Sequence, residues 1–73
     1  MPRVVFRVHP HKGRWIVTRG GRQPVQFVFK RRATAWAVAC AKAHPLSQVV
    51  VHGRGGQIQT EWTYGDDPPQ RKG

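Results

Sequence analysis

The chain has 73 residues, of which 13 are Lys or Arg and only 3 are Asp or Glu, giving a formal net charge of +10. This length predicts a single domain that buries only about 60% of its unfolded surface. The single cysteine, Cys40, excludes an intrachain disulfide, and no apolar run or signal-peptide core indicates a membrane or secreted protein, so a cytoplasmic location is expected.

The first part of the chain predicts three strands. Residues 3–9 alternate in polarity with period two, and Pro10 is expected to end this strand. Residues 14–19 and 25–29 predict two further strands, separated by the hairpin signal Gly20-Gly21. The faces expected to be buried carry Val4, Phe6, Val8, Trp15, Val17, Val25, Phe27 and Phe29.

A helix is predicted over residues 31–43, where every second residue from Ala33 is alanine, the strongest helix former. The helix is expected to end at His44-Pro45, because a residue before proline avoids helical dihedrals. The alanines are so numerous that the buried stripe could be rotated by one position. Helical spacing favours a stripe of Ala35, Trp36, Ala39, Cys40 and Ala43.

Two strands are predicted after the helix. Residues 48–52 are almost continuously apolar, which indicates a central strand, and residues 57–63 alternate in polarity after the 53–56 loop. The order β-β-β-α-β-β predicts an α+β domain with an antiparallel sheet packed on one helix. We expect this domain to span residues 1–64 and residues 65–73 to form a flexible tail.

Four motifs are distributed over almost the whole chain. They are Arg14-Trp15-Ile16-Val17, Phe29 before the alanine-rich helix, Val-His-Gly-x-x-Gly-x-Ile from Val51 to Ile58, and Tyr-Gly-x-Asp-Pro from Tyr64 to Pro68. Together these motifs resemble a small bacterial family of domains of unknown function. The resemblance implies a fold and a bacterial or phage origin, and it implies no activity.

The chain departs from that family in its charges. Lys30, Arg31 and Arg32 stand where the family usually has Asp and Thr before the helix, and Gly55 replaces a common Asp in the loop. The helix also lacks the acidic residues that are usual in the family. The basic character is therefore expected to belong to this chain more than to its relatives.

A weaker resemblance covers residues 14–43. A Trp strand, a turn, a second strand, a Phe and an alanine-rich helix are similar to plant-type AP2 and phage-integrase arm-binding domains. Those domains place a three-stranded sheet in the DNA major groove, with Arg and Trp contacts from the face opposite the helix. This resemblance is an analogy of fold and implies a binding face rather than a target.

The charge pattern predicts an anionic partner. No acidic residue precedes Glu61, so internal ion pairs cannot neutralise the cations, and nucleic acid is the usual anion for such a domain. The alternatives are a solvated face that discourages aggregation and a plain turn at the glycine-rich loop. The residues expected to contact nucleic acid are Arg3, Arg7, Arg14, Arg19, Arg22, Lys30, Arg31, Arg32 and Arg54.

Other chemistry is not expected. Metal sites need closely grouped ligands, and the histidines are scattered along the chain without a Cys pair. Cys40 is expected to pack in the core, and paired carboxylates occur only at Asp66-Asp67. We therefore expect no enzyme, metal, cofactor or small-molecule substrate.

Two functions remain open at this point. The first is a small nucleic-acid-binding protein, with double-stranded DNA favoured over RNA and a nucleoid location implied. The second is a homodimeric protein-interaction module without catalytic activity. The second is supported by Val5, Ile16 and Val28, apolar residues that are expected to face away from the core.

Overall fold

The computed structural model describes residues 3–44 and 46–65. It confirms the α+β class and the predicted order of elements, while most of the tail predicted at 65–73 lies outside the described residues. The elements are β1 (Val4–His11), β2 (Arg14–Arg19), β3 (Val25–Phe27), α1 (Lys30–Lys42), β4 (Ser47–His52) and β5 (Ile58–Tyr64).

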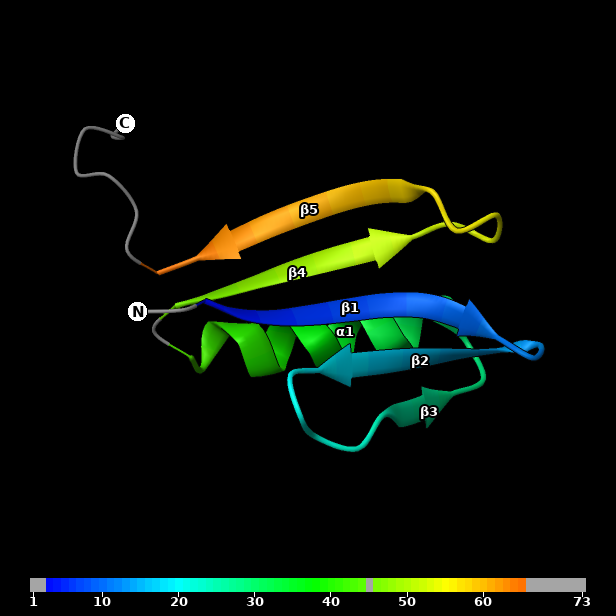
Figure 1. Cartoon of the computed structure of the whole chain (residues 1–73), viewed down its shortest axis with the longest axis horizontal. Coiled ribbons are helices and arrows are strands. Elements are labelled where there is room, and N and C mark those ends of the chain that lie inside the picture. Colours follow the sequence, from blue (N-terminus) through cyan, green and yellow to red (C-terminus); the bar gives the residue numbers. More distant parts are fainter. Residues whose placement is uncertain (1–2, 45, 66–73) are drawn as a thin grey trace.

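The five strands form one mixed sheet in the order β3-β2-β1-β4-β5. Three neighbouring pairs are antiparallel as predicted, but β1 and β4 are parallel. The reason is the helix: α1 carries the chain from the edge strand β3 across one face of the sheet, so β4 enters alongside β1 in the same direction (Figure 1). A parallel pair needs such a crossover connection.

Two strand boundaries differ from the prediction. Pro10 does not end β1, because the strand continues to His11 and Pro10 pairs with Trp15 of β2. The pairing of β1 with β4 stops at Val8. On that side of β1, Pro10 has no paired strand that would require a backbone N–H, so proline is tolerated there. The turn that follows has positive φ at both Lys12 and Gly13, as in a two-residue type I′ hairpin.

β3 is shorter than predicted and ends at Phe27, pairing with β2 as an edge strand of the main sheet. Phe29 was expected in the core, but it is the extended residue before α1 and is 53% exposed. Its carbonyl accepts the backbone N–H groups of Arg32 and Ala33. Phe29 therefore starts the helix instead of continuing the strand.

The buried stripe of α1 is rotated relative to the prediction. Ala33, Ala37 and Ala41 have no exposed surface, whereas Trp36 and Cys40 are only partly buried. Alanines without side-chain bulk allow the helix to lie close to the sheet, and the large Trp36 ring is displaced to the rim against Phe27, with ring centroids 5.8 Å apart. The predicted stripe residues that are exposed are Ala35, Ala39 and Ala43.

The core lies between these alanines and the inner face of the sheet. Phe6, Val8, Val17 and Val49 are fully buried there. Ser47 is also fully buried, and its hydroxyl donates a 2.7 Å hydrogen bond to the carbonyl of Ala41. The same carbonyl also accepts the backbone N–H of His44, so the Ser47 bond adds a second partner there and ties the start of β4 to the end of the helix.

Among the described residues, one helix covers one face of the sheet and no element covers the opposite face. α1 packs mainly on β1, β2 and β4, so β5 has exposed apolar side chains at Ile58 and Trp62. Within the described ranges, α1 is too short and too polar to cross a membrane.

The rotated stripe can be tested by adding bulk to α1. We expect Ala37→Leu to lower the free energy of unfolding by about 1–3 kcal/mol, because a fully buried alanine has no room for three more carbons. Ala39→Leu is the matched control on the exposed side and should change it by less than about 0.5 kcal/mol. Urea unfolding measures both, and equal losses would contradict this orientation of the helix.

Candidate functional site

Three chain segments meet at one end of the sheet. β1 ends and β2 begins there, and the parallel strand β4 ends there as well. β3, antiparallel to β2, ends on the same side, so α1 also starts there (Figure 1). We call this region the basic end, defined by Lys12, Arg14, Lys30, Arg31, Arg32 and Arg54.

Trp15 connects two of these segments. Its ring is almost fully buried, and the Lys30 ammonium lies 5.1 Å from the ring centroid. The Arg54 guanidinium, from the β4–β5 loop, lies 5.7 Å from the same centroid. Lys30 Nζ also donates to Oε1 of Gln59 on β5. The indole therefore attracts cations from two separate segments of the chain.

The start of α1 adds to the positive potential. No side chain caps it and its first turn contains no acidic residue, so the positive end of the helix dipole is uncompensated. The Arg31 guanidinium lies 5.2 Å from the ring centroid of Phe29, and Arg32 is exposed. A helix N-terminus already favours an anion, and adjacent cations strengthen that preference.

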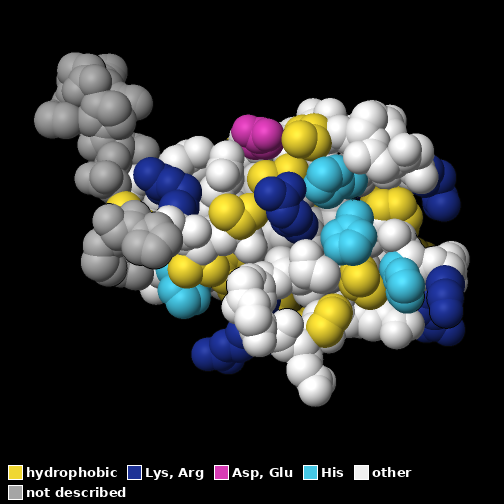
Figure 2. Space-filling model, in the orientation of Figure 1, with side chains coloured by type: hydrophobic (Ala, Val, Ile, Leu, Met, Phe, Trp, Pro, Cys, Tyr) yellow, Lys and Arg dark blue, Asp and Glu magenta, His cyan; other side chains and the backbone are white. Residues whose placement is uncertain are grey.

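Arg7 lies in the middle of the open face and borders two shallow hollows. The first, about 480 Å³, is lined mainly by Arg7, His9, His52, Arg54, Gly55 and Gly56, and we call it the histidine hollow. Figure 2 shows histidine side chains gathered on this face beside a basic side chain.

The second hollow, about 590 Å³, lies toward the opposite end of the sheet, and we call it the arginine hollow. Arg7 lines it together with Arg3, Arg19 and Arg22. Through Arg7, the two hollows form a continuous basic track along β1.

The histidines are scattered along the sequence, but the fold brings two of them together. In the parallel pair, Val8 lies opposite Val51, so His9 and His52 are neighbours on the open face, with ring centroids 6.2 Å apart. The alternation of β1 identified the face of His9. Only the parallel pairing with β4, which the sequence does not display, places His52 beside it.

The environment lowers the pKa of His9 below its usual value of 6.5. Burial is the largest cause, followed by the charges of His52, His11 and Arg7. His52 Nδ1 lies 3.0 Å from the carbonyl oxygen of Gly56. Because a carbonyl only accepts, His52 donates through Nδ1, and its Nε2 is left for another partner.

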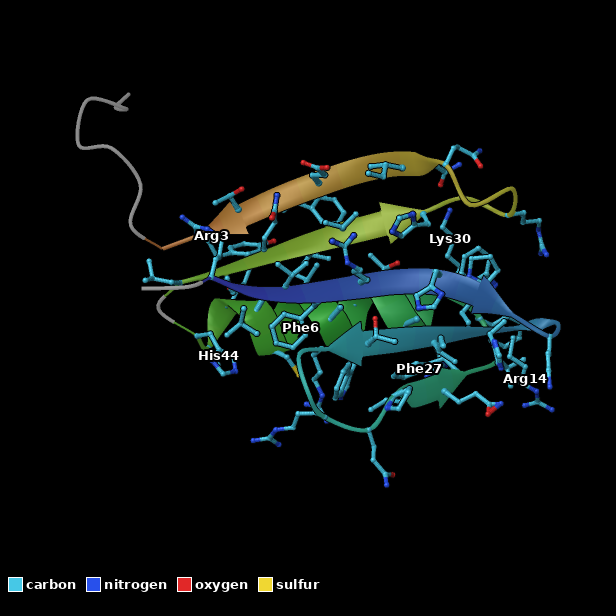
Figure 3. The ribbon with its side chains drawn as sticks, viewed as in Figure 1. Arg3, Phe6, Arg14, Phe27, Lys30 and His44 are labelled. Atoms are coloured by element: carbon cyan, nitrogen blue, oxygen red, sulfur yellow. The ribbon has the colours of Figure 1, made fainter. Side chains whose placement is uncertain are left out.

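Two of the residues predicted to contact nucleic acid, Arg3 and Arg19, have partners within the protein itself. The Arg3 guanidinium donates to the carbonyls of Ser47 and Tyr64, at 3.3 and 3.1 Å. Arg19 pairs with the inward-facing Phe6, and its guanidinium lies 4.9 Å from the ring centroid of Trp36. Figure 3 shows Arg3 at the opposite end of the sheet from Arg14 and Lys30. The fold thus separates the nine predicted cations into two ends, joined by Arg7.

The chemistry of the site suits anions. Residues 3–44 and 46–65 hold no cluster of three possible metal ligands, and Glu61 is the only acidic residue among them. Glu61 accepts a hydrogen bond from the Gln48 amide. The donors around Arg7 are therefore guanidinium, imidazole and backbone groups, which bind oxyanions.

The fold and the site define a small α+β domain with a basic end and a basic track on its open face. Residues 5–64 match a family described as an uncharacterized protein conserved in bacteria (DUF2188), and the chain belongs to this family. The resemblance to a bacterial family of unknown function is thereby confirmed. No curated protein matches the chain, and no solved structure does.

The histidine pair can be tested by titration. Removing the charge of the neighbouring ring with His52→Gln should raise the pKa of His9 toward 6.5, whereas His44→Gln, at the other end of the sheet, should leave it unchanged. Because folding lowers this pKa, the stability linked to His9 is present above pH 6.5 and is lost as the pH falls through the folded value. His52→Gln should reduce that loss. NMR titration and urea unfolding measure the two effects, and an unchanged His9 titration would contradict the pairing.

Proposed function

We propose that this domain binds double-stranded nucleic acid, with DNA favoured, through the phosphate backbone and without catalysis. The observation that carries the proposal is the basic track on the sheet face opposite α1, in which Arg7 joins two hollows whose linings each include at least one further arginine. Electrostatic contacts of this kind supply most non-specific binding to nucleic acid. In a cell, such binding implies association with the nucleoid.

The track is long enough for several phosphates. β1 has 8 residues, and at about 3.3 Å per residue it spans roughly 26 Å. One strand of a duplex places a phosphate about every 3.4 Å along the helix axis. The track along β1, from Arg22 to Arg54, therefore suits the backbone of a duplex lying across it.

The width of the sheet argues for backbone contacts rather than reading of bases. Five strands spaced about 4.8 Å apart span roughly 19 Å, and the major groove is only about 12 Å wide. The AP2 and integrase analogy, in which three strands enter the groove, therefore does not transfer directly. Only the narrow hairpin ends, which carry Arg14 and Arg54, fit a groove.

The proposal predicts a steep dependence of duplex binding on salt. With about six phosphates engaged, log affinity for a labelled 20-base-pair duplex should fall with log salt with a slope of about −5. Arg31→Glu should raise Kd about tenfold. This substitution places an acid in the first turn of α1, where it favours the helix, so weaker binding would not come from unfolding.

Lys42→Glu is the matched control for Arg31→Glu. It makes the same charge reversal at the last residue of α1, away from the basic end, and should raise Kd less than about threefold. Fluorescence anisotropy at several salt concentrations measures all three proteins. No binding of the wild type at low salt would remove the proposal, and equal losses in the two variants would remove the basic end from it.

A homodimer is the second candidate function, and β5 is the observation that favours it. β5 forms one edge of the sheet, contains no Lys or Arg, and has exposed side chains at Ile58 and Trp62. Proteins usually protect sheet edges with lysine or proline, and β5 has neither. In a chain with a net charge of +10, two copies would repel each other least along this cation-free strand.

The apolar residues that first suggested a dimer are less suited to it. Val5 and Ile16 lie on the open face beside cations, while Val28 lines a hollow near the start of α1. If β5 pairs with its copy, Trp62→Lys should convert the dimer to a monomer in sedimentation equilibrium. Val28→Lys, a matched change at another exposed apolar residue, should not. A wild type that sediments as a monomer would eliminate this candidate.

A further inference from the structure

The histidine hollow is lined by four basic residues from two strands and a loop, and the guanidinium of one of them, Arg54, also lies over Trp15. Arg7 and His9 come from β1, His52 ends β4, and Arg54 follows in the loop. The remaining wall includes Gly55 and Gly56, so backbone lies close to any occupant. This arrangement provides charged and polar donors around a space of about 480 Å³.

The groups around His9 contain no acid. On its own strand they are Arg7 and His11, and His52 faces it from β4. From β2, the residue in register with His9 is the apolar Ile16. Glu61, on the same sheet face, pairs with Val50 instead. A cation in the hollow would be repelled by Arg7 and Arg54, whereas an anion would be attracted by every charged group that lines it.

We propose that the histidine hollow binds a phosphate group and takes up a proton on doing so, so that phosphate ligands bind more tightly as the pH falls below neutrality. Phosphate binding stands by itself, and its extension to a duplex rests on the proposed function. The shared chemistry is the phosphate oxyanion, from either a monoester or the diester backbone.

The direction of the pH effect follows from the charges. In the empty hollow, burial and neighbouring cations lower the pKa of His9, so its ring is neutral at neutral pH. A bound oxyanion introduces the opposite charge and raises the pKa. Protons are then taken up on binding, and affinity increases as the pH falls between the bound and empty values. His52, held through Nδ1 by the Gly56 carbonyl, can offer Nε2–H when protonated.

The two sources of phosphate differ at low pH. A phosphate monoester has a second pKa of about 6, so it loses charge over the same range in which His9 gains a proton. A diester keeps one negative charge throughout. Affinity should therefore level off near pH 6 for methyl phosphate, a monoester, and keep rising toward pH 5.5 for dimethyl phosphate and for the duplex.

The test uses the full chain and follows the imidazole nitrogen resonances of His9 and His52 by NMR between pH 5.5 and 8. Methyl phosphate and dimethyl phosphate are the monoester and diester probes, and duplex binding is measured in parallel by anisotropy. We expect Kd for dimethyl phosphate to be about tenfold lower at pH 5.5 than at pH 7.5, equal to a shift of about one unit in one pKa. His9→Gln should remove this pH dependence.

Two further variants separate the site from general effects. His44→Gln is the matched control, because it removes an exposed histidine at the far end of the sheet and should keep the pH dependence. Arg7→Gln changes an exposed side chain and should weaken phosphate binding while His9 still titrates. It keeps the test decisive if His9→Gln does not fold.

The possible results distinguish a failure of the phosphate site from a failure of the proposed duplex binding. Probes that leave both histidine resonances unchanged, a pH dependence that survives His9→Gln, or a phosphate affinity that Arg7→Gln leaves unchanged would overturn the phosphate site. Duplex binding that persists without that pH dependence would overturn the extension of this site to a duplex, while the proposed function would stand. Phosphate binding without any duplex binding would support the site and remove the proposed function.

Discussion

The packing of α1 against the sheet determines which surfaces of this domain are free. Ala33, Ala37 and Ala41 have no exposed surface, so the helix lies close to β1 and β2 with little side chain between the layers. A helix of 13 residues covers only part of a five-stranded sheet. Within residues 3–44 and 46–65, the sheet face opposite α1 and the edge strand β5 are consequently left without a covering element.

The same helix also decides the direction of β4. Because α1 carries the chain back across the sheet, β4 runs parallel to β1, and the ends of both strands meet the start of the helix. His9 and His52 become neighbours for this reason, and the cations of Lys30 and Arg54 both lie near the Trp15 ring. The candidate site is thus a consequence of one crossover connection.

The excess of positive charge determines that this arrangement favours anionic ligands. The described residues contain one acid, Glu61, so cations at the basic end have aromatic rings and amides as partners instead of carboxylates. Such contacts tolerate the cations without neutralising them. A polyanion or a phosphate group supplies the negative charge that is scarce among the described residues. Both proposals therefore concern the same basic surface, one as a track for a duplex and the other as a site for a single phosphate group.

The sequence by itself determined the α+β class, the order of elements and the excess of positive charge, because these follow from local periodicity and composition. It did not determine the helix stripe, since alternating alanines present a small residue on every side of α1. It also did not reveal that Pro10 lies within β1, that Phe29 starts the helix, or that Arg19 lies on Trp36. These depend on which strands become neighbours, as does the meeting of His9 with His52. Tertiary structure decided them because strand pairing joins residues that are distant in the chain.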